Sequence, residues 1–218
     1  GCQYLVAAEQ TTNGVWTSTD YGSNWVRRFT LPPGVYEVCS DSSGQNLVVT
    51  GPTYFSRDFG VSWTLSDAPS DSWFALASSA SGQQVIMYDY VQSGPIYISQ
   101  NFGQNWILTS APAGSWTSAA SSASGQFLVA SMTGDTRSIY TSSDYGATWV
   151  AMAGTERYWV SVASDATGQY IAAGENKGNV YTSSDYGVTF VNRQVVGSYV
   201  CSDSSGANLA AFPLTGTY

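Results

Sequence analysis

The stretch Ser143-Asp144-Tyr145-Gly146-Ala147-Thr148-Trp149 sets the pattern of the chain, because four other segments repeat its spacing of acid or amide, glycine and aromatic residue. An acid at this place can accept backbone N–H bonds inside a tight turn between two strands. The glycine makes φ > 0 inexpensive, and the aromatic residue can fold back as an apolar plug. No second or third acid stands near each one, as a calcium site would require, so the motif indicates a structural turn. The acid or amide positions of the five segments are Asp20, Asp58, Asn101, Asp144 and Asp185.

These residues resemble the Asp-box, the Ser/Thr-X-Asp-X-Gly-X-Thr-Trp/Phe repeat of sialidases, xyloglucanases, sortilin-type receptors and a photosystem assembly factor. The resemblance covers nearly the whole chain, although Asn101 replaces the acid in one copy. It implies an all-β fold, a β-propeller of four-stranded antiparallel blades in which the box is the hairpin between the third and fourth strands. It does not imply one activity, because these relatives share a scaffold and differ in chemistry.

A second motif of Ser or Thr, then Gly, then Gln or Ala recurs between the boxes, each time before a short apolar segment. Its glycines, at 44, 82, 125, 168 and 206, are 38, 43, 43 and 38 residues apart, and the boxes are 38, 43, 43 and 41 residues apart. Repeats of about 40 residues with short strand-like segments are typical of propeller blades. We therefore predict one β-propeller domain over residues 1–218.

The two ends of the chain do not match a simple ring. Residues 3–8 align with the second strand of a later repeat, so the chain is predicted to enter at a second strand. It then leaves after a first strand at 199–202, a second at 208–212 and the start of a third at 216–218. This count predicts five or six blades, or seven if flanking residues are missing.

The composition limits the possible partners. Only 10% of the residues are charged, the net charge is −8, and the seven cations are scattered along the chain. Nucleic-acid binding, which needs a basic stripe, is therefore not expected. No apolar run reaches the roughly 18 residues of a membrane span, so no membrane insertion is expected. The polar, sparsely charged composition favours an extracellular or cell-surface protein, and the missing initiator Met suggests a processed or excised chain.

Cysteine and histidine usage argues against a metal or other cofactor. The chain has three cysteines, Cys2, Cys39 and Cys201, and no histidine. Cys39 and Cys201 stand in identical Val-Cys-Ser-Asp-Ser-Ser-Gly contexts, where other repeats carry alanine. Two interpretations stay open: each is a small buried residue, or the two form a disulfide between the first and last inner strands.

The loops between second and third strands, and those between repeats, are where the repeats differ and where a propeller would meet a ligand. Trp73, Trp116 and Trp159 each precede the glycine of their repeat by nine residues, so they are predicted to share one ring position. They could stack on sugar rings or pack against a neighbouring blade. Tyr88 and Tyr90, around Asp89, begin a long loop and are further candidates for ligand contacts, with a solvated loop as the alternative.

An enzyme interpretation finds little support. The sialidase comparison requires an Arg-Ile-Pro motif and three arginines, and the sequence has no Arg-Ile-Pro. Without histidine, no Ser/His or Cys/His pair exists for nucleophilic catalysis. The leading hypothesis is a secreted, non-catalytic module that binds a glycan or protein ligand. The alternatives are an assembly protein that self-associates through unpaired end strands, and a glycoside hydrolase relative using acids outside the boxes.

Overall fold

The computed structural model describes residues 3–34, 37–69, 73–89, 94–134 and 137–214. Every regular element in these ranges is a β-strand, so the all-β prediction is confirmed. The described part of the chain contains no helix of the length and apolarity that a membrane span needs. The strands form two compact units, one of Gly1–Val91 with Pro95–Leu108 and one of Gln92–Gly94 with Thr109–Tyr218. The expectation of a single domain over residues 1–218 stays a prediction.

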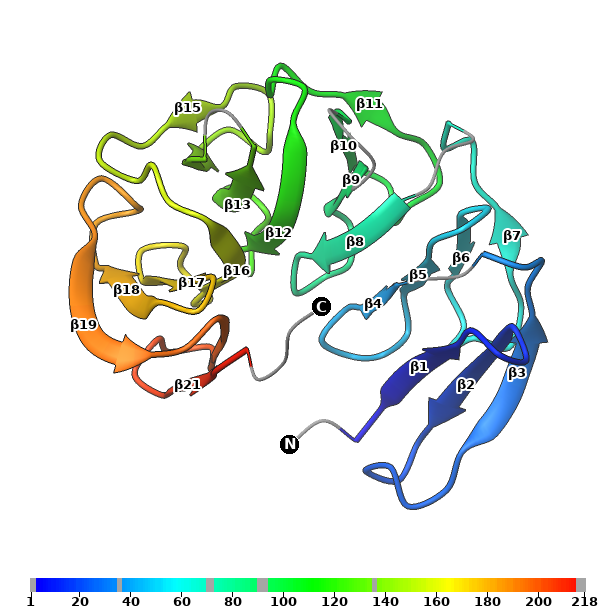
Figure 1. Cartoon of the computed structure of the whole chain (residues 1–218). Helices are drawn as coiled ribbons and strands as arrows, with labels where there is room; N and C mark the ends of the chain where they lie inside the picture. The colour runs from blue at the N-terminus through cyan, green and yellow to red at the C-terminus, as the bar shows by residue number, and fades with distance from the viewer. Residues whose placement is uncertain (1–2, 35–36, 70–72, 90–93, 135–136, 215–218) are drawn as a thin grey trace. The chain divides into compact units, whose positions relative to one another are not determined.

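The first unit holds three antiparallel sheets, each with its strands in chain order (Figure 1). A three-stranded sheet contains β1 (Leu5–Glu9), β2 (Gly14–Ser18) and β3 (Val26–Thr30). A four-stranded sheet contains β4 (Val38–Ser40), β5 (Leu47–Val49), β6 (Tyr54–Ser56) and β7 (Thr64–Leu65). Another contains β8 (Trp73–Ser78), β9 (Val85–Asp89), β10 (Ile96–Ser99) and β11 (Ile107–Leu108).

The second unit repeats this meander. Its first sheet contains β12 (Ser115–Ser121), β13 (Leu128–Thr133), β14 (Ile139–Ser142) and β15 (Val150–Ala151). Its second contains β16 (Trp159–Ser164), β17 (Ile171–Glu175), β18 (Asn179–Ser183) and β19 (Val191–Val196). A two-stranded sheet follows, with β20 (Tyr199–Ser202) and β21 (Leu209–Phe212).

The predicted strand order within the repeats is confirmed. At the start of the chain, the three-stranded sheet begins with β1, which aligns with the second strands of the later repeats. At the end of the chain, β20 and β21 correspond to a first and a second strand. The predicted third strand at 216–218 lies outside the described residues. The number of blades and the closure of a ring stay predictions.

Each box forms the turn between the third and fourth strands, as predicted, and one hydrogen-bond set recurs in it. Ser142 Oγ accepts the N–H of Gly146 at 2.9 Å and donates to Asp144 Oδ1 at 2.8 Å. The carboxylate of Asp144 accepts the backbone N–H of Thr148 at 2.8 Å and its hydroxyl at 2.7 Å. These two bonds from Thr148 hold the pKa of Asp144 below its ordinary value. The acid therefore acts as a hydrogen-bond hub of the turn.

The amide at Asn101 keeps the same geometry without the charge. Asn101 Oδ1 accepts the N–H of Asn105 at 2.9 Å, and its Nδ2 donates to Asn105 Oδ1 at 2.7 Å. The other boxes place a donor at this fourth position, namely Asn24, Ser62, Thr148 and Thr189. Because the amide of Asn101 donates where an acid would accept, its partner Asn105 provides an acceptor oxygen.

The turn is tighter than the sequence alone suggests. The glycine of each box has φ > 0, as expected, and the aromatic residue before it also has φ between 60° and 64° in every box. Two successive residues with φ > 0 define a type I′ turn, whose twist matches that of the flanking strands. A non-glycine residue in this region costs about 1–2 kcal/mol, and the recurring serine and acid bonds offset that cost. The aromatic residues concerned are Tyr21, Phe59, Phe102, Tyr145 and Tyr186.

The two repeated motifs meet at one edge of each sheet, as predicted. The N–H of the box aromatic donates to the carbonyl of the glutamine after the Ser-Gly turn, for example Tyr186 to Gln169 at 3.1 Å. In two boxes the aromatic also stacks on a ring of the preceding sheet in the same unit. Tyr186 lies 4.7 Å from Phe127 and Phe59 lies 5.0 Å from Tyr4, measured between ring centroids. The motifs therefore bind sheet to sheet as well as closing hairpins.

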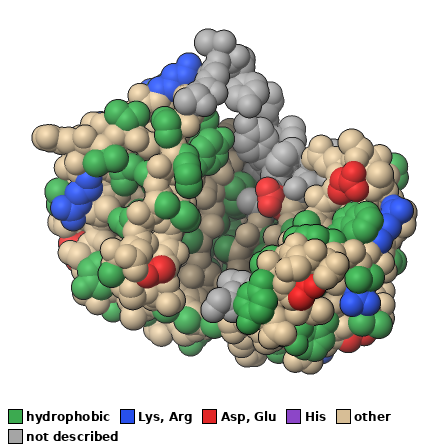
Figure 2. Space-filling model, turned by 90° about the horizontal axis from the view of Figure 1, so that it is seen from below, with side chains coloured by type: hydrophobic (Ala, Val, Ile, Leu, Met, Phe, Trp, Pro, Cys, Tyr) green, Lys and Arg blue, Asp and Glu red, His purple; other side chains and the backbone are tan. Residues whose placement is uncertain are grey.

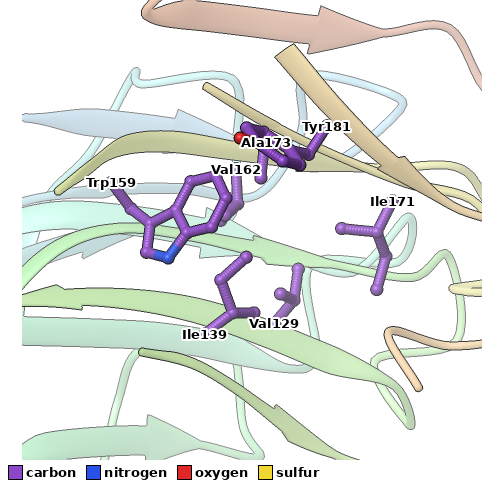
Figure 3. Packing of buried hydrophobic residues seen from close by; sticks show 7 residues of the cluster. All are labelled: Val129, Ile139, Trp159, Val162, Ile171, Ala173 and Tyr181. Atoms are coloured by element: carbon purple, nitrogen blue, oxygen red, sulfur yellow. The ribbon is translucent and has the colours of Figure 1, made fainter. Parts of the chain in front are cut away.

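The best-defined core of the second unit lies between its two four-stranded sheets (Figure 3). Trp159 packs edge-on against Tyr181 with ring centroids 5.3 Å apart. Around them lie small and branched side chains from neighbouring strands, which can interdigitate in a thin layer between sheets. The cluster consists of Val129, Ile139, Trp159, Val162, Ile171, Ala173 and Tyr181.

Cys39 and Cys201 are free thiols, so the disulfide interpretation is corrected. Cys39 packs against the apolar cluster of Val48, Phe55 and Val85, and burial raises the pKa of its thiol to about 12. A thiol held in that way is protonated and unreactive at neutral pH. For Cys39 the small-residue interpretation holds, whereas Cys201 is exposed.

Candidate functional site

The three predicted stacking tryptophans are buried, which corrects their assignment as exposed ligand contacts. Trp73 and Trp116 are 0% exposed and Trp159 is 1% exposed. Each stands at the start of a first strand and packs edge-on against the tyrosine of its own third strand, which is Tyr97, Tyr140 or Tyr181, with centroids 5.2–5.3 Å apart. The indole N–H groups of Trp73 and Trp159 are also bonded inside the protein, to Pro69 O and Thr155 O. Their repeated position serves packing within the sheet.

The other two predicted ligand contacts, Tyr88 and Tyr90, have different outcomes. Tyr88 is 2% exposed, in a stretch of β9 where residues 85–88 are all buried, and its assignment as an exposed contact is corrected as well. Tyr90 lies outside the described residues.

A group of polar and aromatic side chains gathers on the predicted ligand-facing loops of the second unit. These loops join β13 to β14, β15 to β16 and β17 to β18, away from the box turns. We call this group the loop cluster. It consists of Arg137, Arg157, Tyr158, Glu175, Asn176 and Lys177.

Backbone hydrogen bonds hold the three loops of this cluster together. The N–H of Arg157 donates to Arg137 O at 2.8 Å, and the N–H of Asn176 donates to Tyr158 O at 2.7 Å. The third loop is fixed in turn by Ser198, whose hydroxyl donates to Glu175 O at 3.0 Å and accepts the N–H of Lys177 at 3.1 Å. The side chains therefore project from a connected frame, which favours a defined geometry over a mobile one.

Tyr158 is the exposed aromatic ring of the loop cluster. It is 47% exposed, and the guanidinium carbon of Arg137 lies 3.8 Å from its ring centroid. Arg137 Nε also donates to Gly134 O at 3.0 Å, which fixes the guanidinium in place. A cation at this distance is attracted to the ring face, so the ring and the guanidinium hold each other.

A second arginine of the loop cluster, Arg157, lies between Tyr181 and Glu175. The guanidinium carbon of Arg157 lies 4.8 Å from the ring centroid of Tyr181, and its Nη1 lies 3.9 Å from Glu175 Oε1. This ion pair is long and partly exposed, so it adds little to stability. Both groups remain able to hydrogen-bond an incoming hydroxyl or amide, because neither is locked in a short bidentate pair.

Arg57, which stands inside the second box, has a structural role. Arg57 donates from Nη2 to Asn101 O and to Gln104 Oε1, both at 3.1 Å, and lies 5.0 Å from the ring centroid of Phe102. It therefore joins its own box to the box that contains Asn101. Within the described ranges no group of His, Cys, Asp or Glu could hold a metal ion.

Charged side chains are sparse on the face of the molecule that Figure 2 shows. On the face drawn in Figure 2, acidic and basic side chains stand singly among hydrophobic and uncharged ones. This agrees with a chain in which 10% of residues are charged. The loop cluster differs from this pattern, because it brings together three of the seven cations of the chain.

The sequence predicted that ligand contacts lie on loops of these kinds and named Trp159 as one candidate, with packing as the alternative. The structure buries Trp159, whereas the neighbouring Tyr158 is the exposed ring. The signal was available, because alternate residues of a strand face opposite sides and an inward tryptophan turns its predecessor outward. The meeting of Arg137 with Tyr158 depends on two loops far apart in sequence and carried no such signal.

Comparisons with known proteins support the fold. No family model matches the chain, and no curated protein matches it. Among solved structures, the chain is similar to the GH74 xyloglucanase of Xanthomonas campestris, at 16% identity and a TM-score of 0.67 over 88% of this chain and 36% of that one. It is also similar to the Niastella koreensis GH74 enzyme, at 19% identity and a TM-score of 0.72 over 92% of this chain and 32% of that one.

A third similar structure is a chain of a nidogen/laminin complex, at 11% identity and a TM-score of 0.63 over 87% of this chain and 74% of that one. The chain spans about a third of the length of the two GH74 enzymes. At these identities the likeness shows the fold, which is a β-propeller-like scaffold, and leaves the function to the site.

Proposed function

We propose that the chain is a secreted, non-catalytic recognition module that binds a glycan or glycoprotein through the loop cluster. The observation that carries the proposal is Tyr158, a half-exposed ring held 3.8 Å from the guanidinium of Arg137. A ring that is already fixed loses little entropy when a ligand packs on it. The xyloglucanase among the similar structures supports a glycan as the ligand class.

The chemistry of the cluster suits a sugar. An aromatic ring offers an apolar face for the C–H groups of a pyranose, and planar guanidinium, amide and carboxylate groups can each bond a pair of hydroxyls. Arg157, Glu175 and Asn176 supply these groups beside the ring. Membership of the Asp-box family and an extracellular location belong to the same proposal.

Replacing Tyr158 with alanine is expected to weaken glycan binding by about tenfold or more, the usual effect of losing a central aromatic anchor. Screening on a glycan array and titration of the best hit by calorimetry would measure it. The matched control is Tyr145→Ala, which removes an aromatic of similar exposure, 40% against 47%, from a box turn. Equal binding by the Tyr158 variant and the wild type would contradict the proposed site.

A glycosidase remains the competing proposal, and the same material tests it. Glycosidases use two carboxyl groups flanking the scissile bond, and Glu175 already lies beside Arg157. Incubation with xyloglucan and assay of reducing ends is expected to show no turnover. Turnover that disappears in Glu175→Gln would replace the recognition proposal with the enzymatic one.

Assembly of copies is a second candidate function, favoured by the surface around the last strand. Among the described residues β21 pairs only with β20, and Leu209 and Phe212 are 44% and 59% exposed. Edge strands of this kind readily pair with other chains. Light scattering over a concentration series is expected to show association that Leu209→Lys reduces, and a strict monomer at every concentration would exclude this function.

A further inference from the structure

A groove of about 490 Å³ lies in the second unit, beside the last strand, β21. Val180 and Val195 line one wall, on the sheet of β16–β19, and Leu209 and Ala211 line the other wall on β21. Ser184 places one end of the groove beside a box turn, away from the loop cluster. The groove therefore follows the face of a sheet and reaches the edge of the next one.

The strand that forms the second wall differs from the other second strands of its unit. Leu128, Ile171 and Leu209 each begin a second strand, three residues after the glycine of a Ser-Gly or Thr-Gly turn. Leu128 is 5% exposed and Ile171 is 4% exposed, whereas Leu209 is 44% exposed. β13 and β17 each pair with a third strand, but among the described residues β21 pairs only with β20. The exposure of Leu209 therefore marks the place of a third strand.

The equivalent groove one sheet earlier shows what fills such a space. It lies between the sheet of β12–β15 and the sheet of β16–β19, and its volume is about 190 Å³. Tyr186, from the box turn that follows the third strand β18, lines this groove and stacks on Phe127 with ring centroids 4.7 Å apart. Tyr170 takes the place of Phe127 in the wider groove, and within the described ranges no ring stacks on it. A third strand with its box aromatic is thus what distinguishes the narrower groove.

The five third strands that the structure describes share a sequence pattern. Each ends at the serine of a box and has an aromatic residue two places before it, and the box then adds an acid or amide, an aromatic residue and a glycine. An acid of a box is opposite in charge to Arg193, the one charged residue in the described lining of the wider groove. A hairpin of this pattern therefore offers the backbone, the ring and the charge that fit the groove. The five pairs of aromatic residue and serine are Trp16 and Ser18, Tyr54 and Ser56, Tyr97 and Ser99, Tyr140 and Ser142, and Tyr181 and Ser183.

We propose that β21 and its groove bind a β-hairpin of this pattern from a partner polypeptide, which would form the third and fourth strands of the last sheet. Such strand addition gains main-chain hydrogen bonds along the edge. In the register of β17 with β18, Ile171 pairs with Ser183, so the serine of the donated hairpin would pair with Leu209. The box aromatic of the hairpin would then stack on Tyr170.

A second copy of this chain is not the proposed donor. Each box hairpin of the chain is already paired within its own sheet, and a copy would have to give one of them up. The groove is also separate from the loop cluster, so glycan binding can fail without affecting this proposal.

The test uses the whole chain and a synthetic peptide with the sequence of residues 178–190, which contains β18 and its box. Saturable amide shifts in NMR are expected at Tyr170, Leu209 and Ala211, with a dissociation constant on the order of 0.1 mM because the peptide must be ordered on binding. A scrambled peptide of the same composition is expected to bind at least about tenfold more weakly. Equal binding of the scrambled peptide, or no saturable shifts, would overturn the proposal. Shifts confined to β18 and β19 would mean that the peptide replaces the hairpin of the chain itself, and would overturn it as well.

Matched variants locate the site. Leu209→Lys places a charge in the apolar wall and is expected to weaken peptide binding by about tenfold or more. Leu108→Lys makes the same change at a residue of β11 that is 58% exposed, and is expected to leave binding unchanged. In the peptide, replacing the residue that corresponds to Tyr186 with alanine is expected to weaken binding about three- to tenfold, through loss of the stacked ring. Equal effects of the two lysine variants would overturn the assignment to β21.

The assembly candidate uses the same edge, so light scattering is repeated with the peptide present. A complex of one chain with one peptide is expected, including at concentrations where copies associate without it. Copies that stay associated and keep the peptide out would assign the edge to a second copy and overturn the hairpin proposal.

Discussion

Replacing Trp159 with alanine is expected to lower the free energy of unfolding of the second unit by about 3–5 kcal/mol. The side chain is 1% exposed and lies in the cluster that contains Ile139, Ile171 and Tyr181. Its removal leaves a cavity between two sheets whose backbones are fixed by their own hydrogen bonds and cannot collapse into it. It also deprives the carbonyl of Thr155 of the indole N–H that donates to it at 2.6 Å. Urea unfolding followed by circular dichroism would measure the loss.

Two further variants make this prediction specific. Tyr158→Ala, one residue away and half exposed, is expected to cost less than about 1 kcal/mol while weakening glycan binding. Trp159→Phe should cost about 1–3 kcal/mol, from the smaller ring and the lost indole bond to Thr155 O, which keeps the backbone N–H of Arg157 as a donor at 2.8 Å. A loss below about 1 kcal/mol in Trp159→Ala would show that the tryptophan is not a structural anchor.

Local chemistry explains why so much of the fold was readable from the sequence. The box, the Ser-Gly turn and the period between them identified the strand order of every sheet, because each motif satisfies its own hydrogen bonds within a few residues. The sequence also shows that Asn101 stands where the other boxes have an acid. Asn105 is also visible in the sequence, but only the structure shows that its side-chain oxygen accepts the hydrogen bond from the amide of Asn101.

The candidate site was less predictable because it depends on alternation and on contacts between loops. A tryptophan repeated at one position is equally consistent with stacking on a ligand and with packing inside the protein. Only the observed burial against Tyr97, Tyr140 and Tyr181 distinguishes the two roles.

Replacing Gly168 with alanine is expected to destabilise the second unit by about 2–5 kcal/mol, through two causes that add. The residue has φ of 82°, a left-handed conformation that costs an alanine about 1–2 kcal/mol. A Cβ at this position would also stand 2.5 Å from the Cβ of Phe127 on the neighbouring sheet, well inside contact distance. Relieving that overlap requires the sheets to move apart, and overpacking of this kind costs about 1–3 kcal/mol.

Gly154 separates the two causes. It has φ of 73°, close to that of Gly168, but a Cβ there would meet nothing within 4 Å. Gly154→Ala is therefore expected to show the backbone cost alone, about 1–2 kcal/mol. The difference between the two variants, measured by urea unfolding, reports how closely the Ser-Gly turn approaches the preceding sheet. The same approach recurs where Gly44 meets Tyr4 and Gly206 meets Tyr170. Equal losses in the two variants would mean that the glycines of this motif are required for their turn alone, and that sheet-to-sheet packing does not depend on them.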